Sequence, residues 1–315
     1  MKWTMELTRK GYADALVELG HETENVVVFD ADLAASTLTR QFAKAFPARF
    51  FDMGIAEQGM VATAAGMALM GFRPFVTSYA MFVAGRAWEI IRQQISYGEC
   101  PVCVVGAHGG ISVGKDGPTH QCTEDLALMR VLPKMNVVVP CDYWETFKVV
   151  KFAGTHSIPF YFRMGREKCP VVTSKDASWE LGKAYELAPG NDGAFVVCGL
   201  TVSIALEARE LLEKEGIRPR VINNPSIKPF DRETLLKTAR ECGAIVTAEE
   251  HSVIGGLGST VVEILCQSDN RIPVGILGLN DRYLESGPPE DLLEKAGLTP
   301  ENLAATLKET LRKRA

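Results

Sequence analysis

Glu57 is the one charged residue in "MGIAEQGMVATAAGMALMGF", the segment that runs from 53 to 72. Apart from Gln58 and Thr63, every residue that follows Glu57 in this segment is small or apolar. Burying an ionised carboxylate in such surroundings costs several kcal/mol unless a partner compensates the charge. The sequence therefore predicts that another group, from elsewhere in the chain or from a ligand, meets Glu57.

A second group of reactive side chains lies in "HGGISVGKDGPTHQ" (108–121). Four glycines and a proline predict a loop with backbone conformations that other residues could not adopt. A structural loop with solvated side chains is one interpretation. The other is a rigid loop that presents His108, Asp116 and His120 to a polyhydroxylated substrate, because general acids and bases often sit on such loops.

Several common motifs are absent from the sequence. It has no G-x-x-x-x-G-K-[ST] phosphate loop, no G-x-S-x-G nucleophile elbow and no histidine pair at zinc-ligand spacing. "GGLGST" lacks the glycine spacing of a dinucleotide-binding loop. Cys100 and Cys103 form a C-x-x-C, but no second pair stands at zinc spacing, so we expect buried, reduced thiols and no metal site in this chain.

The elements that must position these side chains follow an α/β pattern. Helical segments are expected at 36–46, with Ser36 as N-cap, from Glu57 onward, and at 85–98. Continuous runs of Val, Ile and Phe are typical of parallel strands covered on both faces. Such runs occur at 25–32, 49–54, 73–78, 101–108, 136–140 and 159–165. The pattern predicts an open, doubly wound, mostly parallel sheet, whose ligands bind beyond the carboxyl ends of the strands.

The chain is long enough for two domains, with 315 residues. A segment without a sustained hydrophobic period separates two series of alternating strands and helices. We therefore expect a first domain at 1–170, a linker at 171–190 and a second, smaller α/β domain at 191–315.

Composition excludes some classes of protein. The chain is 46% hydrophobic and 23% charged, as in ordinary globular proteins, and its formal charge of −5 gives no reason to expect nucleic-acid or membrane binding. The first residues, "MKWTMELTRKGYADAL", contain no long apolar run, so neither signal peptide nor membrane anchor is expected. The reduced thiols favour the cytoplasm.

Three stretches of the first half together resemble the pyrimidine-binding domain of the transketolase family. They are "FFDMGIAEQGMVATAAGMALMGFRPFVTSYAMF", "HGGISVGKDGPTHQCTEDLALMRVLPKMNVVVP" and "FRMGREKCPVV". The second half, with "TAEEHSVIGGLGS", resembles the carboxyl-terminal domain of the same family. The resemblance covers essentially the whole chain, in order.

The resemblance implies thiamine diphosphate as cofactor and assigns a catalytic role to Glu57. In the family, a glutamate at this position hydrogen-bonds a ring nitrogen of the cofactor's aminopyrimidine, and burial favours the protonated carboxyl that this task requires. Tyr79 and Phe82 match two aromatic positions around that ring, with Phe82 as the stacking partner. Gly85 falls where fused relatives carry a third aromatic residue. Asp32 and Leu33 match positions that approach the cofactor.

The resemblance also implies a set of substrate-binding residues. Arg9, Ser36 and Arg166 match groups that hold the phosphate of a sugar, a task that suits the planar fork of arginine. The loop residues His108, Asp116 and His120 match positions that contact hydroxyls and the carbonyl near the reacting carbons, and both histidines are implied to be catalytic. Lys115 departs from the acidic residue that is usual in the family and is expected to be solvated.

A partner subunit is implied as well. Family members hold the diphosphate and its Mg²⁺ or Ca²⁺ through a G-D-G motif in a domain that precedes this one, and neither "GKDG" (114–117) nor "GNDG" (190–193) stands in that setting. The chain is therefore expected to be the carboxyl-terminal half of a split transketolase of the pentose phosphate pathway. It is expected to be inactive alone and active as an α2β2 heterotetramer with the amino-terminal subunit.

Three alternatives stay open at this point. The beta subunit of a 2-oxoacid dehydrogenase and deoxyxylulose-phosphate synthase are also thiamine enzymes, but a 2-oxoacid would not need the set formed by Arg9, His108, Asp116, His120 and Arg166. The third alternative, a non-catalytic scaffold subunit, is disfavoured by the intact Glu57 and "DGPTHQ".

Overall fold

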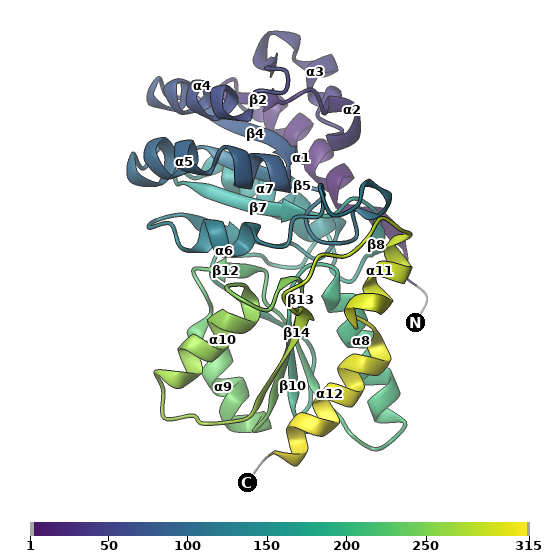
Figure 1. Cartoon of the computed structure of the whole chain (residues 1–315). Helices are drawn as coiled ribbons and strands as arrows, with labels where there is room; N and C mark the ends of the chain where they lie inside the picture. Colours follow the sequence, from purple (N-terminus) through teal and green to yellow (C-terminus); the bar gives the residue numbers. More distant parts are fainter. Residues whose placement is uncertain (1–2, 314–315) are drawn as a thin grey trace.

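A mostly parallel, seven-stranded sheet organises the first half of the protein in the computed structural model, which describes residues 3–313 (Figure 1). Its strand order is β12-β6-β7-β5-β4-β2-β3, with all neighbours parallel except β12 and β6. The strands are β2 (Val26–Asp30), β3 (Phe50–Asp52), β4 (Arg73–Tyr79), β5 (Cys103–Ala107), β6 (Asn136–Val138), β7 (Phe160–Met164) and β12 (Ser226–Lys228). The predicted doubly wound α/β fold is confirmed.

Alternate residues of each strand enter two different cores. Val26 and Val28 of β2 face a layer that contains α1 (Thr8–Glu22), α3 (Arg40–Ala45) and α7 (Tyr143–Thr155). Val27 and Phe29 of the same strand face the other layer. That layer contains α4 (Glu57–Leu69), η2 (Met81–Arg86), α5 (Trp88–Ile90), η3 (Ile91–Tyr97) and α6 (Asp125–Arg130). Burial on both faces explains the continuous apolar runs.

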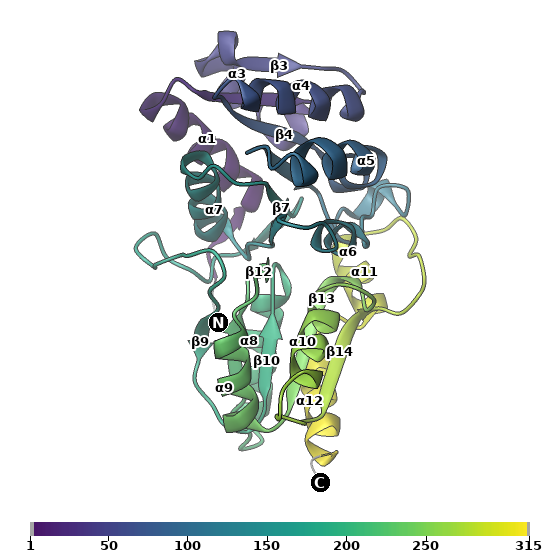
Figure 2. The same cartoon turned by 90° about the vertical axis from the view of Figure 1, so that its left-hand side faces the viewer.

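The second half forms a five-stranded sheet of order β14-β13-β10-β11-β9 below the first (Figure 2). Its strands are β9 (Tyr185–Ala188), β10 (Ala194–Val197), β11 (Arg220–Asn223), β13 (Ile245–Ser252) and β14 (Val274–Leu279). Its helices are α8 (Thr201–Glu213), α9 (Arg232–Cys242), α10 (Leu257–Cys266), α11 (Pro289–Ala296) and α12 (Pro300–Arg312). The antiparallel edge strand β9 lies inside the segment 171–190 that was expected to be a linker.

One local prediction was wrong, and a second is confirmed only in part. The helix expected at 36–46 is divided into α2 (Ala34–Thr37) and α3, because Leu38 adopts a left-handed φ of 67°, and Ser36 lies within α2 instead of capping it. The buried Asp30 carboxylate fixes this turn by accepting hydrogen bonds from the hydroxyls of Thr37 and Thr39. The segment predicted as a helix at 85–98 has mostly π-helical turns, in η2 and η3.

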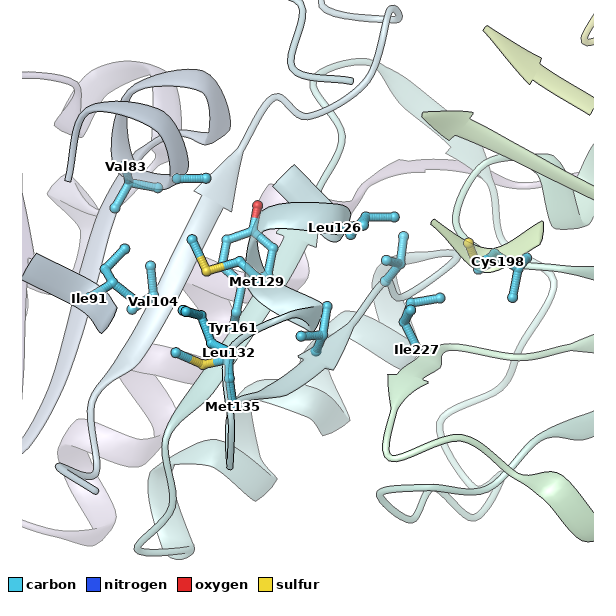
Figure 3. Close-up of a cluster of buried hydrophobic side chains, with 14 of the residues drawn as sticks. Val83, Ile91, Val104, Leu126, Met129, Leu132, Met135, Tyr161, Cys198 and Ile227 are labelled. Carbon is cyan, nitrogen blue, oxygen red and sulfur yellow. The ribbon is translucent and has the colours of Figure 1, made fainter. Parts of the chain in front are cut away.

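The two halves share one hydrophobic core. Figure 3 shows it running from Val83 and Ile91 past Met129 and Tyr161 to Cys198 and Ile227 of the second half. A short antiparallel pair, β1 (Met5–Leu7) with β8 (Lys168–Pro170), forms a separate two-stranded sheet. The seven-stranded sheet itself includes β12, which comes from the second half of the chain.

Polar groups of β13 add to this contact between the halves. His251 Nε2 accepts a hydrogen bond from the Ala127 N–H, and the Glu250 carboxylate accepts one from the Ser112 N–H. The Arg163 guanidinium donates to the Glu250 carbonyl and forms a buried ion pair with Asp125. Sequence reasoning had assigned no role to this part of "TAEEHSVIGGLGS".

Cys100 and Cys103 are buried free thiols, as predicted. Burial raises the pKa of both thiols. Within the described part of the chain, none of the helices combines the length and apolar character needed to span a bilayer.

Glu145 generates a prediction about stability. Its buried carboxylate accepts hydrogen bonds from the Cys141 N–H at 2.7 Å and from Asn223 Nδ2 of the second half at 2.8 Å. Burial outweighs these bonds and raises its pKa from 4.5 to about 7. Because the folded protein binds this proton more tightly than the unfolded chain, the stability that it contributes is present below pH 4.5 and is lost as pH rises through 7.

The free energy of unfolding of Glu145→Gln is therefore expected to rise relative to that of the wild type as pH increases from 5 to 8, by up to roughly 3 kcal/mol. A separation of one pH unit between folded and unfolded pKa values corresponds to about 1.4 kcal/mol. Urea unfolding at both pH values measures the effect, with Glu89→Gln, at an exposed position, as control. Parallel pH dependence of wild type and Glu145→Gln would contradict the assignment.

Candidate functional site

The carboxyl ends of β2, β4, β5 and β7, which are neighbours in the sheet, bring the predicted site residues together. Tyr79 ends β4 and His108 directly follows β5, while Ser36 and Arg166 come from the segments after β2 and β7. Arg9, in the first turn of α1, reaches this edge and donates from Nη1 to the Ser36 carbonyl at 2.6 Å. The convergence expected from a parallel sheet is thus observed.

Four aromatic side chains form the centre of the site, and we call Tyr79, Phe82, His108 and His120 the ring cluster. The Tyr79 and Phe82 rings are stacked, with centroids 6.1 Å apart. The His108 ring lies 4.4 Å from that of Tyr79, and the His120 ring packs edge-on against Phe82 at 5.2 Å. These contacts join the glycine-rich loop at 108–121, which we call the glycine loop, to the end of β4.

His108 is held in an unusual state. It is fully buried, its φ of 56° is left-handed, and neither ring nitrogen has a hydrogen-bond partner among residues 3–313. Burial, followed by the positive charges of Arg9 and Arg166, lowers its pKa to about 3. Strained backbone and unpaired buried nitrogens are typical of groups that await a ligand.

Two arginines provide positive charge beside the ring cluster. Arg166 Nη1 lies 2.8 Å from the Asp116 carboxylate and donates to the Val113 carbonyl. The pKa of Arg9 is lowered by burial and also by the neighbouring Arg166, and its Nε has no partner within the described chain. The Ser36 hydroxyl, 3.1 Å from the Tyr79 hydroxyl, lies beside them. An anion bound between the guanidinium groups would relieve their repulsion.

Glu57 begins α4 and is 1% exposed, as the apolar segment predicted. Its charge is compensated by a residue that sequence reasoning missed: Arg86 Nη1 donates to Oε2 at 2.7 Å. The Ser78 hydroxyl donates to Oε1 at 3.3 Å. The Arg86 guanidinium also lies 5.0 Å from the centre of the Phe82 ring, so it joins Glu57 to the ring cluster. No spacing in the sequence links Arg86 to Glu57, because the pairing depends on how η2 packs against α4.

The other predicted positions lie at the rim. Leu33 packs against the core that includes Tyr79, whereas Asp32 is exposed and donates its N–H to the Asp52 carboxylate. Lys115 is exposed, in line with the expected solvated side chain. A side chain at Gly85 would meet the methyl group of Met81 at 2.8 Å, so a third ring would require Met81 to move.

The glycine loop is covered by the second half of the protein. Gln121 Nε2 donates to the Glu285 carbonyl, and the Ser286 hydroxyl donates to the Lys115 carbonyl. An added Cβ at Gly114, whose φ is 75°, would lie 3.1 Å from Pro289. The loop is therefore held from outside as well as by its own glycines.

An open pocket adjoins the ring cluster, with Phe82, Arg86, Thr119 and Glu124 among its lining residues. A separate cavity of about 170 Å³ lies between the two halves, and none of the four ring-cluster residues lines it. Among residues 3–313, no group of three or more His, Cys, Asp or Glu side chains is placed to hold a metal ion.

Comparison with known proteins gives matches over nearly the whole chain. Residues 6–171 match the family described as transketolase, pyrimidine binding domain, and residues 182–303 match transketolase, C-terminal domain. The putative transketolase C-terminal section of Methanocaldococcus jannaschii is 41% identical over 307 residues, which cover 97% of this chain and 96% of that protein.

Two further relatives are similar over nearly their full length. One of the subunits of the apulose-4-phosphate transketolase of Phocaeicola vulgatus is 38% identical over 306 residues, 97% of each chain. A solved split gene transketolase, described as an inactive beta4 tetramer, is 48% identical with a TM-score of 0.90, over 98% of this chain and 99% of that one.

The state of His108 can be tested directly. With a pKa of about 3, its imidazole is expected to remain neutral between pH 5 and pH 8, so its carbon-bound protons do not shift in an NMR titration over that range. The spectrum is assigned with His108→Gln. A titration midpoint near the ordinary value of 6.5 would contradict the burial and charge argument.

Proposed function

The chain belongs to the transketolase family, and we propose that it is the subunit that supplies the pyrimidine-binding half of a two-chain transketolase. The reaction proposed is transfer of a two-carbon ketol unit from a ketose phosphate to an aldose phosphate, as in the pentose phosphate pathway. The observation that carries the proposal is a buried carboxyl group, Glu57, beside the partly exposed, stacked Phe82 ring.

The residues at this end of the site fit the aminopyrimidine of thiamine diphosphate. Phe82 offers a ring face for stacking, and the Glu57 carboxyl can exchange a proton with a ring nitrogen. When bound, the cofactor supplies the carbanion chemistry that breaks and forms the carbon–carbon bond. The diphosphate and its Mg²⁺ or Ca²⁺ are proposed to bind to an amino-terminal partner subunit in an α2β2 assembly.

The remaining residues support a phosphorylated sugar as substrate. Arg9 and Arg166 provide the charge for a phosphate group, with Ser36 as a further hydroxyl beside them. Neutral His108 can donate one hydrogen bond and accept another, which suits substrate hydroxyl and carbonyl groups. His120, next to Phe82, is proposed to act on the reacting carbons from the cofactor side.

Reconstitution tests the function. The chain is mixed with an amino-terminal transketolase subunit from the same organism, thiamine diphosphate and Mg²⁺, and ketol transfer from xylulose 5-phosphate is measured. Activity is expected for the mixture and not for either chain alone. Activity with pyruvate instead of the ketose phosphate would favour deoxyxylulose-phosphate synthase or a 2-oxoacid dehydrogenase, and cofactor binding without any turnover would favour a scaffold subunit.

Substitution of the arginines tests the substrate class. Arg9→Met and Arg166→Met are expected to raise KM for erythrose 4-phosphate, because each lost charge-assisted contact costs about 1.5–3 kcal/mol. The KM for glycolaldehyde, which has no phosphate, is expected to change little. Arg40→Met, at an exposed position on α3, is the control. Equal losses for both acceptors would show that these residues do not recognise phosphate.

A further inference from the structure

Arg86 occupies the two contacts that the proposed function reserves for the cofactor ring. Its Nη1 donates to Glu57 Oε2 at 2.7 Å, and its guanidinium carbon lies 5.0 Å from the centre of the Phe82 ring. An aminopyrimidine bound in this site would hydrogen-bond the same carboxyl group and stack on the same ring. Both groups are planar and hydrogen-bond a carboxyl group, so they compete for one position.

We propose that Arg86 is a latch that closes over Glu57 and Phe82 when no pyrimidine is bound and swings out when the cofactor enters. The inference rests on the proposed function, since it names the ligand that opens the latch. It assigns to Arg86 a role in controlling access to the site.

Burial explains why a latch is needed. Glu57 is 1% exposed, and its other contact, the Ser78 hydroxyl at 3.3 Å, carries no charge. Without a cation, this carboxylate would be buried uncompensated, a costly state. The Arg86 guanidinium removes that cost until the cofactor arrives. Once the guanidinium withdraws, the carboxyl can share a proton with the pyrimidine nitrogen instead.

The position of Arg86 allows it to move. Its side chain is 46% exposed, in contrast to that of Glu57, and it stands at the end of the π-helical segment η2. Gln58 Nε2 donates to the Arg86 carbonyl, so the backbone has its own contact, independent of the guanidinium. The open pocket that Arg86 lines includes the Glu124 carboxylate, which offers an alternative partner for the displaced guanidinium.

Thermal unfolding of the chain alone tests the closed latch. Arg86→Met keeps the apolar stem and removes the charge, so its Tm is expected to fall below that of the wild type. The double variant Glu57→Gln with Arg86→Met is expected to recover most of the loss, because no buried charge remains. Arg92→Met, at an exposed position in η3, is the control and is expected to leave Tm unchanged. An unchanged Tm for Arg86→Met, or no recovery in the double variant, overturns the latch.

Cofactor titration of the reconstituted complex tests the opening. A latch closed nine-tenths of the time weakens apparent affinity about tenfold, so Arg86→Met is expected to bind thiamine diphosphate, with Mg²⁺ present, about tenfold more tightly than the wild type. Equal or weaker binding by Arg86→Met overturns the latch, and weaker binding would show that Arg86 holds the cofactor. If Arg86→Met does not fold, Arg86→Gln, which removes the charge but keeps a polar side chain, is judged by the same criterion.

The two proposals fail in different ways. If the wild-type complex binds thiamine diphosphate and the Arg86 variants bind it no better, the latch is wrong and the function stands. If the wild-type complex does not bind thiamine diphosphate, the proposed function is wrong and the latch fails with it, whatever the Tm values show.

Discussion

The burial of Glu57 is the constraint on which the arrangement of the site depends. A carboxyl group at the start of an apolar helix has to be met by a cation, by hydrogen-bond donors or by a proton, because water does not reach it. In this structure Arg86 and Ser78 meet it. Arg86, the last residue of η2, therefore lies beside the start of α4, where it contacts Glu57 and Gln58.

The same control of charge extends across the site. Burial, together with the guanidinium groups of Arg9 and Arg166, lowers the pKa of His108, and the carboxylates of Asp116 and Glu167 lie beside Arg166. His108 is kept neutral with both nitrogens free for a ligand. The unpaired buried nitrogens of His108, beside two arginines, can meet the polar groups of a ligand.

The second half of the protein contributes by holding the first. The loop that carries His108, Asp116 and His120 is bonded to Glu250, Glu285 and Ser286 of the second half, so its shape depends on both halves. The shared core and the strand β12 make the pair a single unit. A change at the contact between the halves can therefore alter the site without touching a site residue.

Sequence reasoning predicted the parallel sheet, the burial of Glu57 and the convergence of the strand ends, because these follow from apolar runs and from sheet geometry. It missed the break at Leu38, which is imposed by Asp30, a tertiary contact. It missed β12, because nothing in the local sequence indicates that a strand of the second half joins the sheet of the first half. It also missed Arg86 as the partner of Glu57, because the pairing depends on how η2 packs against α4 and not on spacing in the sequence.

The most direct measurement concerns Glu57 itself. In the reconstituted complex of Glu57→Gln, the side chain keeps its size but cannot pass a proton to the pyrimidine nitrogen. Exchange of the proton on the thiazolium carbon of bound thiamine diphosphate for deuterium is measured by quenched-flow NMR. The account predicts that exchange is severely slowed relative to the wild type. Exchange at the wild-type rate would contradict it, because the buried carboxyl would then have no part in activating the cofactor.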